Sequence, residues 1–483
     1  MRVLLINPPY DVERYMGKLS KMAFVFQPIG LTYIAAYLRE KSIEVKIYDA
    51  QVDHRNIKDV VKEFNPHIIG ITCVTALVYS AIEVAKLIKE HFSDKIIVVG
   101  GIHPTIRPQD FAEEKSIDYI ALGEGEITMY EFVKEVESGG NPERISGIMR
   151  FSKGKASSGP PRLMEKNIDI FPMPALDLLE MNKYKVSPDN RTDDRVGVML
   201  TSRGCPFDCI FCSNRLLTKK TYRAHSIERV CTEIANLIDK YQVSQVFIQD
   251  DNFAVDKKRS KEICREFIRR GINKKISWWA EARVDCVDEE LLILMAEANC
   301  KIISYGLESG NQRLLDLIQK NITLAQVKTV INLTKRSGIQ IRASFILGLP
   351  TETRKESLET IRFAKKLKID QVRFAIATPF PGTKLWDIAQ EEGTMKFDNW
   401  KQFSMMAGYS EGLPVYAPKG RSPEELAKLQ RSANLSFYLR PRIILVFLRR
   451  INNIGAFKDT IHGFMRFLLA SLFPSKHYLK RKQ

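Results

Sequence analysis

The fold of this chain is decided by residues 201–212, which read Thr-Ser-Arg-Gly-Cys-Pro-Phe-Asp-Cys-Ile-Phe-Cys. They follow an apolar run, Val196–Leu200, that predicts a buried strand. Three thiolates on one loop, those of Cys205, Cys209 and Cys212, can hold three corners of a cubane iron–sulfur cluster and leave one iron open. Structural zinc usually takes four ligands from paired Cys-x2-Cys units, and the sequence has no second pair nearby. Three unrelated core cysteines are the remaining alternative.

The Cys-x3-Cys-x2-Cys spacing resembles the signature loop of the radical S-adenosylmethionine (SAM) enzymes. Phe211 precedes the last cysteine, where this family carries an aromatic residue beside the adenine. The resemblance implies a [4Fe–4S] cluster on the three cysteines, with SAM chelated to the open iron. It also implies one-electron cleavage of SAM to a 5′-deoxyadenosyl radical, which needs an external one-electron reductant. In such enzymes the cofactors do the difficult chemistry, and the protein positions and shields it.

Length and composition allow a multidomain protein of a reducing compartment. The 483 residues are 45% apolar, which fits two to four domains. Five of the eight cysteines are scattered through apolar stretches, which is not the pattern of a disulfide framework. The N-terminus has too few apolar residues for a signal peptide, and no apolar run approaches the length of a spanning helix. We expect a cytoplasmic location.

Residues 1–140 alternate strand-like and helix-like segments, which predicts a doubly wound parallel sheet. The expected strands are Val3–Ile6, Val45–Tyr48, Ile68–Thr72, Ile96–Val99 and Tyr119–Leu122. The expected helices are Leu31–Arg39, Ile57–Phe64, Ser80–Phe92, Phe111–Glu114 and Met129–Val136. Ligands of such sheets lie at the carboxyl ends of the strands, so the loops that follow the strands are candidate binding segments.

This domain resembles the cobalamin-binding domain that precedes many radical SAM cores. The resemblance rests on Asn7-Pro8-Pro9, Gln27-Pro28-Ile29-Gly30-Leu31, the run from Gly100 to Thr105, and Gly123-Glu124-Gly125-Glu126. It implies cobalamin contacts from Pro8, Pro9, Tyr10, Thr72, Gly100, Gly101, His103, Gly123 and Glu124. The Asp-x-His-x-x-Gly run that supplies a lower cobalt ligand in many such domains is absent. The alternatives are a degenerate domain that binds nothing and, for His103, a bond to a loop carbonyl.

Three further segments follow the first domain. Residues 141–193 read as a proline-rich linker with a hairpin at Gly147–Gly154. Residues 194–385 alternate again, and six strand–helix units fit the open (β/α)6 barrel of radical SAM enzymes rather than a closed eight-unit barrel. Residues 386–483 are predicted to be a helical, basic C-terminal region.

The expected units of the barrel are assigned from the same pattern. Its strands are Gly197–Thr201, Gln245–Gln249, Ser277–Ala280, Lys301–Gly306, Ile339–Ile346 and Gln371–Ala377. Its helices are Ile227–Tyr241, Lys258–Arg270, Glu289–Ala298, Leu324–Ser337 and Lys355–Leu367.

Polar residues after the barrel strands are the candidate SAM ligands. They are Asp250, Asp251 and Arg283, together with Glu308 and Ser309, which match the Gly-x-Glu-Ser-Gly run of the radical SAM family. A resemblance to the family's Gly-x-Ile-x-Gly-x-x-Glu run, which packs around adenine, adds Ile346 and Gly348. A guanidinium suits a carboxylate because it offers two parallel donors, and an acid can hold an amine or the ribose hydroxyls. The structural alternatives are a helix N-cap for the aspartates and a surface ion pair for Arg283. No catalytic side chain can be named from the sequence.

The C-terminal region holds much of the positive charge. Residues 421–483 contain 13 Lys and Arg against three acids, within a chain of net charge +17. Apolar blocks such as Ile443–Leu448 are edged by arginines, which suits an interfacial helix at an anionic membrane surface, or a helix packed on the barrel. We do not expect a nucleic-acid partner, because no reader module is apparent.

The combined resemblance is to the subfamily of carbon methyltransferases and cyclases like anaerobic magnesium-protoporphyrin ester cyclase. It implies methylation of an unactivated carbon of a hydrophobic lipid, isoprenoid or tetrapyrrole by methylcobalamin and a 5′-deoxyadenosyl radical. Oxidative cyclisation is the first alternative, and an iron–sulfur redox sensor with a basic tail is the second. Methylthiolation of transfer RNA would need three more cysteines in the first domain, which has only Cys73.

Overall fold

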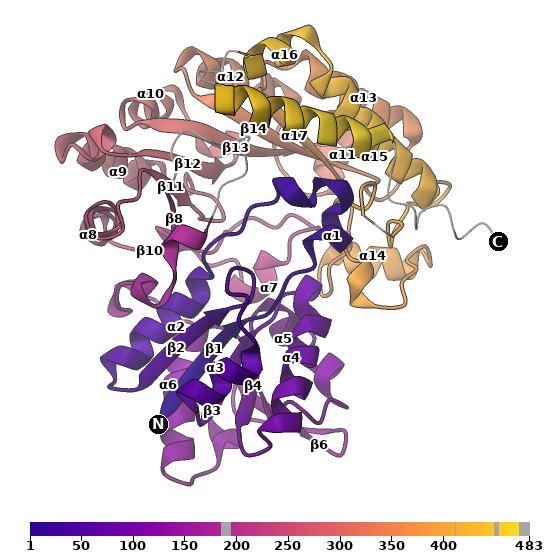
Figure 1. Cartoon of the computed structure of the whole chain (residues 1–483). Coiled ribbons are helices and arrows are strands. Elements are labelled where there is room, and N and C mark those ends of the chain that lie inside the picture. Colours follow the sequence, from indigo (N-terminus) through magenta and orange to yellow (C-terminus); the bar gives the residue numbers. More distant parts are fainter. Residues whose placement is uncertain (185–194, 411, 449–453, 473–483) are drawn as a thin grey trace. The chain divides into compact units, whose positions relative to one another are not determined.

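The computed structural model describes residues 1–184, 195–410, 412–448 and 454–472 (Figure 1). The chain forms two compact units. Unit 1 contains Met1–Tyr10 and Val25–Tyr184, and unit 2 contains Asp11–Phe24 and Lys185–Gln483. Both units are α/β, as predicted.

Unit 1 is built on a seven-stranded sheet in the order β2-β1-β3-β4-β5-β6-β7. The first five strands in this order are parallel, and β6 and β7 are antiparallel. β1 runs Val-Leu-Leu-Ile at residues 3–6 without one exposed position, which is typical of a parallel strand covered on both faces. The strands are β1 (Arg2–Asn7), β2 (Glu44–Asp49), β3 (Ile68–Thr72), β4 (Ile96–Gly100), β5 (Tyr119–Ala121), β6 (Ile148–Ser152) and β7 (Lys155–Ser158).

Helices connect the parallel strands of unit 1. They are α2 (Ile29–Glu40), α3 (Ile57–Phe64), α4 (Val78–His91), α5 (Ile102–Ile106) and α6 (Gly125–Glu137). The Asn56 side chain caps α3 by accepting from the Lys58 backbone N–H, which explains why this helix begins where the sequence predicts. The predicted helix at 111–114 is wrong, because a 3₁₀ turn (Pro108–Phe111) ends there.

The two units divide the chain differently from the four predicted segments. The hairpin β6–β7, expected within a linker, pairs with β5 and extends the sheet of unit 1. Residues 11–24, expected within the first domain, belong to unit 2. There α1 (Val12–Met16) leads into the 3₁₀ turn η1 (Gly17–Met22), and the buried side chain of Leu19 packs with Tyr409 and Ala470.

Unit 2 is built on six parallel strands in the order β15-β14-β13-β12-β11-β8, the open six-stranded sheet that the sequence predicts. The strands are β8 (Val196–Met199), β11 (Gln245–Ile248), β12 (Ser277–Ala282), β13 (Cys300–Glu308), β14 (Gln340–Leu347) and β15 (Gln371–Ile376). A short pair, β9 (Ser202–Arg203) and β10 (Arg223–Ala224), stands apart from this sheet.

Helices of unit 2 cover one face of its sheet. Trp278 of β12 packs on Phe267, and the Tyr305 hydroxyl of β13 lies 3.0 Å from the Thr334 hydroxyl. We call the opposite face, to which alternate residues point, the inner face. The helices are α7 (Asn214–Thr218), α8 (Ile227–Asp239), α9 (Lys257–Arg269), α10 (Glu289–Glu297), α11 (Gln312–Leu317), α12 (Leu324–Arg336), α13 (Arg354–Lys366) and α14 (Lys384–Glu391).

The edge of the sheet at β15 is closed by α15 (Pro423–Tyr438). Gln430 and Tyr438 donate to the carbonyls of Phe374 and Val372, over 2.7 and 2.8 Å. The Asn434 amide oxygen accepts from the Phe374 N–H over 3.3 Å. Side chains four residues apart on one helix thus satisfy backbone groups that another strand would otherwise pair.

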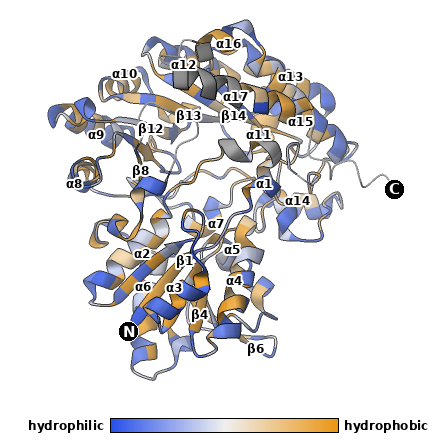
Figure 2. Cartoon of the chain, viewed as in Figure 1, coloured by the Kyte–Doolittle hydropathy of each residue, from blue (hydrophilic) through white to orange (hydrophobic). Residues whose placement is uncertain are grey.

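The C-terminal region also contains α16 (Pro441–Leu448) and α17 (Ile454–Leu472). Among the described residues, no helix is long and apolar enough to cross a bilayer. Figure 2 shows the hydrophobic strands β1 and β4 between helices that carry both hydrophobic and hydrophilic residues.

Candidate active site

The cysteine loop lies between β8 and α7 and is anchored to unit 2 by backbone hydrogen bonds. The Ile210 N–H donates to the Ile318 carbonyl over 3.2 Å, and the Ile210 carbonyl accepts from Leu385 over 3.0 Å. A turn inside the loop joins the Cys212 N–H to the Cys209 carbonyl over 3.1 Å. These bonds fix the backbone on which the thiols stand.

The three thiols of this loop influence one another. Burial raises the pKa of the Cys212 thiol to about 11, and the nearby Cys209 and Cys205 add to the rise. Burial also raises the pKa of Cys205. In the described ranges, no three His, Cys, Asp or Glu side chains converge on a single ion. Three thiolates of a cubane each bind a different iron, so such convergence is not required, and the cysteine set fits the cluster.

Asp250 holds the start of the cysteine loop. One of its carboxylate oxygens accepts from the backbone N–H groups of Thr201 and Ser202, over 2.6 and 3.1 Å. The other accepts from the hydroxyls of the same two residues, over 2.5 and 2.6 Å. Asp250 is 1% exposed and both of its oxygens accept from the loop, so the structure supports a role in holding this loop, and the predicted contact with SAM stays a prediction.

Gly204 and Asp251 continue this support toward Cys205. The Asp251 carboxylate accepts from the Gly204 N–H over 3.0 Å. Gly204 has a φ of +93°, and a Cβ there would lie 2.1 Å from the Thr221 carbonyl oxygen. Glycine is therefore required at this position. Asp251 is exposed, which leaves it available for the predicted contact with SAM.

Arg283, predicted as a SAM ligand, points at a cysteine of the loop. Its guanidinium lies 3.7 Å above the Phe207 ring, and its Nη1 is 3.5 Å from the Cys209 sulfur. Asp285 accepts from Nε and Nη2 over 3.0 and 2.9 Å, and the Lys320 carbonyl accepts from Nη2 over 2.5 Å. The fork that could bind the SAM carboxylate is thus occupied by Asp285, and Nη1 places positive charge beside the cluster position.

A buried ion pair stands next to this arginine. Lys320 Nζ donates to the Glu308 carboxylate over 2.9 Å, and both side chains are almost fully buried. Glu308 has a φ of +60°, a left-handed backbone that a non-glycine residue adopts at a cost of about 1 to 3 kcal/mol. The pairing of β13 with β14 also shifts between Gly306 and Glu308. Sequence analysis missed Lys320, because nothing in its neighbourhood marks it as the partner of an acid twelve residues earlier.

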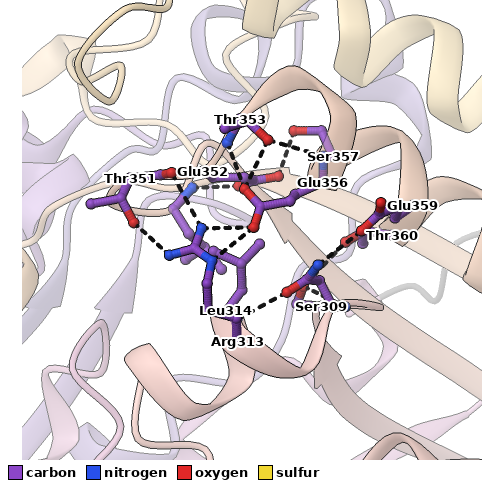
Figure 3. A network of polar contacts seen from close by, with 12 residues as sticks. Ser309, Arg313, Leu314, Thr351, Glu352, Thr353, Glu356, Ser357, Glu359 and Thr360 are labelled. Carbon is purple, nitrogen blue, oxygen red and sulfur yellow. Dashed lines mark hydrogen bonds and ion pairs between the residues drawn. The ribbon is translucent and has the colours of Figure 1, made fainter.

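Ser309 does not face a ligand position. Its hydroxyl is fully buried, lies 3.1 Å from the Thr360 hydroxyl, and accepts from the Asn311 N–H. Figure 3 shows that this contact belongs to a polar network between the loop after β13 and α13. In the same network Arg313 donates to Glu356 over 2.8 Å. The role of Ser309 that the structure supports is to fix the loop that carries Glu308.

The loop after β14 contains the remaining candidates. Ile346 is half-buried on the inner face. Gly348 has a φ of +80°, and a Cβ there would approach Leu426 of α15 to 2.8 Å. The neighbouring Glu352 is 1% exposed, accepts from the Leu349 N–H over 2.6 Å and from the Ser357 hydroxyl, and burial raises its pKa to about 7. Phe211 of the cysteine loop is half-buried.

In unit 1, the predicted cobalamin segments gather at one edge of the sheet. They follow β1, β3, β4 and β5, which are neighbours and parallel, so their carboxyl ends share this edge. The segments hold Pro8, Pro9 and Tyr10, then Thr72, then Gly100, Gly101 and His103, and lastly Gly123 and Glu124.

Two glycines shape this edge. A Cβ on Gly101, whose φ is +112°, would lie 2.8 Å from the Cys73 carbonyl oxygen. Gly123 has a φ of +81° with no atom within 4 Å of a Cβ built there, and its N–H donates to Thr105 over 2.9 Å. Val74 beside them is 43% exposed. An edge of open glycine backbone with an exposed apolar side chain fits a large, partly apolar ligand such as a corrin.

His103 is not a free ligand at this edge. It is 1% exposed, its Nε2 lies 3.0 Å from Asp110, and its Nδ1 lies 3.2 Å from the Thr75 hydroxyl. Both ring nitrogens are therefore engaged within unit 1. The partners are a carboxylate and a hydroxyl, not the loop carbonyl of the alternative, and a contact of His103 with cobalamin stays a prediction.

A second polar group at the carboxyl ends of β1 and β2 was not predicted. The Asp49 carboxylate accepts from Asn7 Nδ2 over 2.9 Å and from the Tyr184 hydroxyl over 2.8 Å. Burial raises the pKa of Asp49. The sequence could not reveal this group, because Tyr184 lies 135 residues from Asp49.

Two family models match the chain. Residues 18–133 match the B12 binding domain, and residues 199–364 match the radical SAM superfamily. An uncharacterized methyltransferase, PH0819 of Pyrococcus horikoshii, is 37% identical over 92% of this chain and 94% of that protein. The chain belongs to the cobalamin-binding radical SAM family.

Other members of the family agree with this assignment. The anaerobic magnesium-protoporphyrin IX monomethyl ester cyclase of Rubrivivax gelatinosus is 32% identical over 81% of this chain and 70% of that protein. The solved structure of the methyltransferase TsrM of Kitasatospora setae superposes with a TM-score of 0.72 at 16% identity, covering 96% of this chain and 99% of that one. This likeness shows the shared fold.

As a member of the cobalamin-binding radical SAM family, this protein is an enzyme. The alternative of an iron–sulfur redox sensor is therefore wrong. Its cofactors are cobalamin, a [4Fe–4S] cluster and SAM. The predicted fold class and cofactors are confirmed, whereas the contacts of individual residues with SAM and cobalamin stay predictions.

Proposed function

We propose that this enzyme methylates an unactivated carbon of a hydrophobic small molecule. The observation that carries the proposal is the pair of family domains together with 37% identity to a methyltransferase across nearly the whole chain. In this chemistry the cluster and SAM supply a carbon radical, and cobalamin supplies the methyl group. A radical route suits a carbon that has no acidic proton.

The residues of unit 2 have distinct proposed parts in this reaction. Cys205, Cys209 and Cys212 would each hold one iron of the cluster, and the fourth iron would remain open to SAM. Arg283 faces a cluster thiolate, where its charge favours the reduced cluster. The Lys320–Glu308 pair stands next to it, and Asp251 is the exposed acid for the amine or the ribose of SAM. Delivery of an electron requires an external one-electron reductant.

Oxidative cyclisation is the second candidate, since a cyclase is 32% identical over most of this chain. The two reactions differ in their products. Methylation consumes SAM as a methyl donor and yields S-adenosylhomocysteine, whereas cyclisation of the same substrate class yields only 5′-deoxyadenosine.

The deciding experiment is product analysis of the anaerobically reconstituted enzyme with hydroxocobalamin and a chemical reductant. We expect about four irons and one cobalt per chain, 5′-deoxyadenosine, and S-adenosylhomocysteine. Cys209→Ala should abolish 5′-deoxyadenosine formation, and Cys264→Ala, a buried thiol of α9, is the matched control. Deoxyadenosine without any S-adenosylhomocysteine would reject methylation in favour of cyclisation.

We further propose that the C-terminal helices contact an anionic membrane surface, from which an apolar substrate could be taken. Several large apolar side chains there are exposed, namely Leu439, Ile444, Leu445, Met465, Leu469 and Leu472. Arg442 of α16 and Arg466 of α17 are exposed among them. Exposed apolar groups edged by arginine suit interfacial binding.

Co-sedimentation with vesicles of phosphatidylglycerol tests this contact. We expect Leu445→Ser with Leu469→Ser to lower the bound fraction several-fold, and Leu163→Ser of unit 1, which is 87% exposed, to leave it unchanged. Equal sedimentation of all three proteins would remove the basis of the membrane proposal.

A further inference from the structure

A groove lies between α12 and α13, on the side of unit 2 where helices cover the sheet. Its volume is about 570 Å³, which is within the range of small-molecule sites. The loop after β13 lies at one end, where Figure 3 shows Glu359 and Thr360 of α13 beside Ser309 of this loop. Leu367 and Lys368, which follow α13, lie at the other end. The residues that line the groove include no predicted ligand of the cluster, SAM or cobalamin, so it is distinct from the candidate active site.

The rim of this groove is basic and its floor is apolar. On the floor, Ile331 and Leu367 are buried and Phe363 is half-buried. The exposed residues of the rim are Lys328 and Asn332 of α12, Arg362 and Lys366 of α13, and Lys368. Long basic side chains can rest their methylene groups on an apolar surface and keep their charged ends in water. The groove therefore offers both an apolar surface and several cationic groups to one ligand.

The four cations of the rim lack a carboxylate partner. Within the part of the chain that the structure describes, their side chains form no hydrogen bond or ion pair. Glu359, the one acid among the lining residues, accepts instead from Asn311 Nδ2 over 2.8 Å. By contrast, the exposed Arg265 and Arg269 of α9 each lie 2.7 Å from a glutamate. Like charges that share a groove repel one another, so a bound anion would stabilise this cluster.

The start of α16 adjoins the same end of the groove. Arg442 Nη1 donates to the Leu367 carbonyl over 3.5 Å, and Arg440 donates to the Lys365 carbonyl. Arg440 also has an Nη2 that is shielded from water and finds no acceptor among the described residues. Leu445 of α16 is 52% exposed. The basic groove is thus followed by a helix that presents apolar side chains to the surroundings.

We propose that the groove between α12 and α13 binds the phosphate headgroup of an anionic phospholipid. Guanidinium and ammonium groups are the usual donors to phosphate oxygens, and Arg362 and Lys366 supply both from one helix face. The apolar floor takes the glycerol carbons, and the acyl chains extend toward α16. The inference rests on the proposed membrane contact for the source of the lipid, and it adds to that contact a site with headgroup specificity. The apolar floor and the exposed side chains of α16 favour a phospholipid over a purely ionic partner.

The test is equilibrium binding of soluble, monomeric lipids to the anaerobic, cluster-loaded full-length enzyme. The ligands are dihexanoyl phosphatidic acid, dihexanoyl phosphatidylcholine, inorganic phosphate and a glutamate decamer. We expect the phosphatidic acid to bind about 10 to 100 times more tightly than the phosphatidylcholine, as for hydrogen bonds between charged groups. It should also bind more tightly than inorganic phosphate, which has no apolar part. The preference should weaken at about 0.5 M salt, because exposed charges are screened.

Variants of the rim locate the site. Arg362→Met combined with Lys366→Met should reduce the preference for phosphatidic acid about tenfold or more. Asn332→Glu removes no cation but places a carboxylate in the groove, and it should also lower the preference. The matched control is Arg265→Met combined with Arg269→Met, which removes the same charge from α9 and should retain the preference.

Four results would overturn the headgroup site. They are equal binding of the two lipids by the wild type, an unchanged preference in both rim variants, equally tight binding of inorganic phosphate, and binding of the glutamate decamer without either lipid. The third result would assign the groove to free phosphate, and the fourth to an acidic protein. Because the lipids are monomeric, these readouts depend neither on vesicles nor on methyl transfer. A retained lipid preference without vesicle co-sedimentation would reject the membrane contact alone, and the reverse pattern would reject the groove alone.

Discussion

Replacement of Asp250 distinguishes a residue that supports the cluster loop from one that binds SAM. The carboxylate accepts four hydrogen bonds from Thr201 and Ser202, and it is 1% exposed. Asp250→Ala would leave four donors without an acceptor at the point where the cysteine loop leaves β8. We therefore expect loss of both stability and iron binding.

The size of the effect follows from these four bonds. A hydrogen bond to a charged acceptor contributes about 1.5 to 3 kcal/mol, but the contributions are not additive and the two hydroxyls can rotate toward other acceptors. We expect Asp250→Ala to lower the free energy of unfolding by about 3 to 5 kcal/mol. Asp250→Asn keeps an oxygen for the two N–H groups and offers an N–H to the hydroxyls, so about 1 to 2 kcal/mol is expected.

Two measurements decide the matter. Urea unfolding of the apoprotein gives the stability, and iron and sulfide analysis after anaerobic reconstitution gives the cluster content. We expect Asp250→Ala to bind clearly fewer than four irons, and Asp250→Asn to bind nearly the full number. If Asp250→Ala keeps its stability and its iron but loses affinity for SAM, the reasoning from the loop is refuted, and the SAM contact predicted from sequence is correct.

Three other substitutions probe separate features. Glu352→Gln should remove a pH effect: the folded-state pKa of about 7 exceeds the usual value of 4.5, so ionisation destabilises the fold. The difference in unfolding free energy between the wild type and this variant should therefore change by about 3 kcal/mol against the wild type between pH 4 and pH 8. Urea unfolding of both proteins at several pH values measures this difference. Gly204→Ala should reduce iron content severely, because its Cβ would meet the Thr221 carbonyl at 2.1 Å. Asn434→Leu leaves the Phe374 N–H unpaired and should cost about 1 to 3 kcal/mol in unfolding.

Each of these three expectations has a contrary result. A difference between wild type and Glu352→Gln that is constant with pH would mean that the pKa of Glu352 is the same in the folded and the unfolded protein. Full iron content in Gly204→Ala would show that the loop tolerates a side chain there, and Gly271→Ala, a left-handed glycine in open space, is its control. An Asn434→Leu protein as stable as the wild type would show that the bond to β15 is replaced by water.

The fold could be predicted because the strands and helices of both sheets have local sequence signals. β3 and α3 begin and end at the residues expected from the sequence, since buried β-branched runs and an Asn cap mark their bounds. The membership of residues 11–24 in unit 2 could not be predicted. It depends on packing between Leu19 and residues some 400 positions later, for which a sequence pattern has no local signal.

The cysteines that bind the cluster could be predicted from the sequence, but the contacts that support them could not. The spacing of the three cysteines depends on a local turn and is visible in the sequence. Asp250 is buried because it bonds Thr201 and Ser202 some 50 residues earlier, and the fork of Arg283 is taken by an acid two residues away. The strained Glu308 became apparent only from its positive φ and its pairing with Lys320.

The helix α15 has a consequence for the handling of this protein. An open sheet has a last strand whose backbone groups would pair with any other extended chain, and here side chains of one helix occupy those groups. A truncated form that ends after β15 would therefore expose the unpaired backbone groups of this edge strand. We expect that form to self-associate into insoluble material. Expression of the protein therefore requires α15, because this helix prevents another extended chain from pairing with β15.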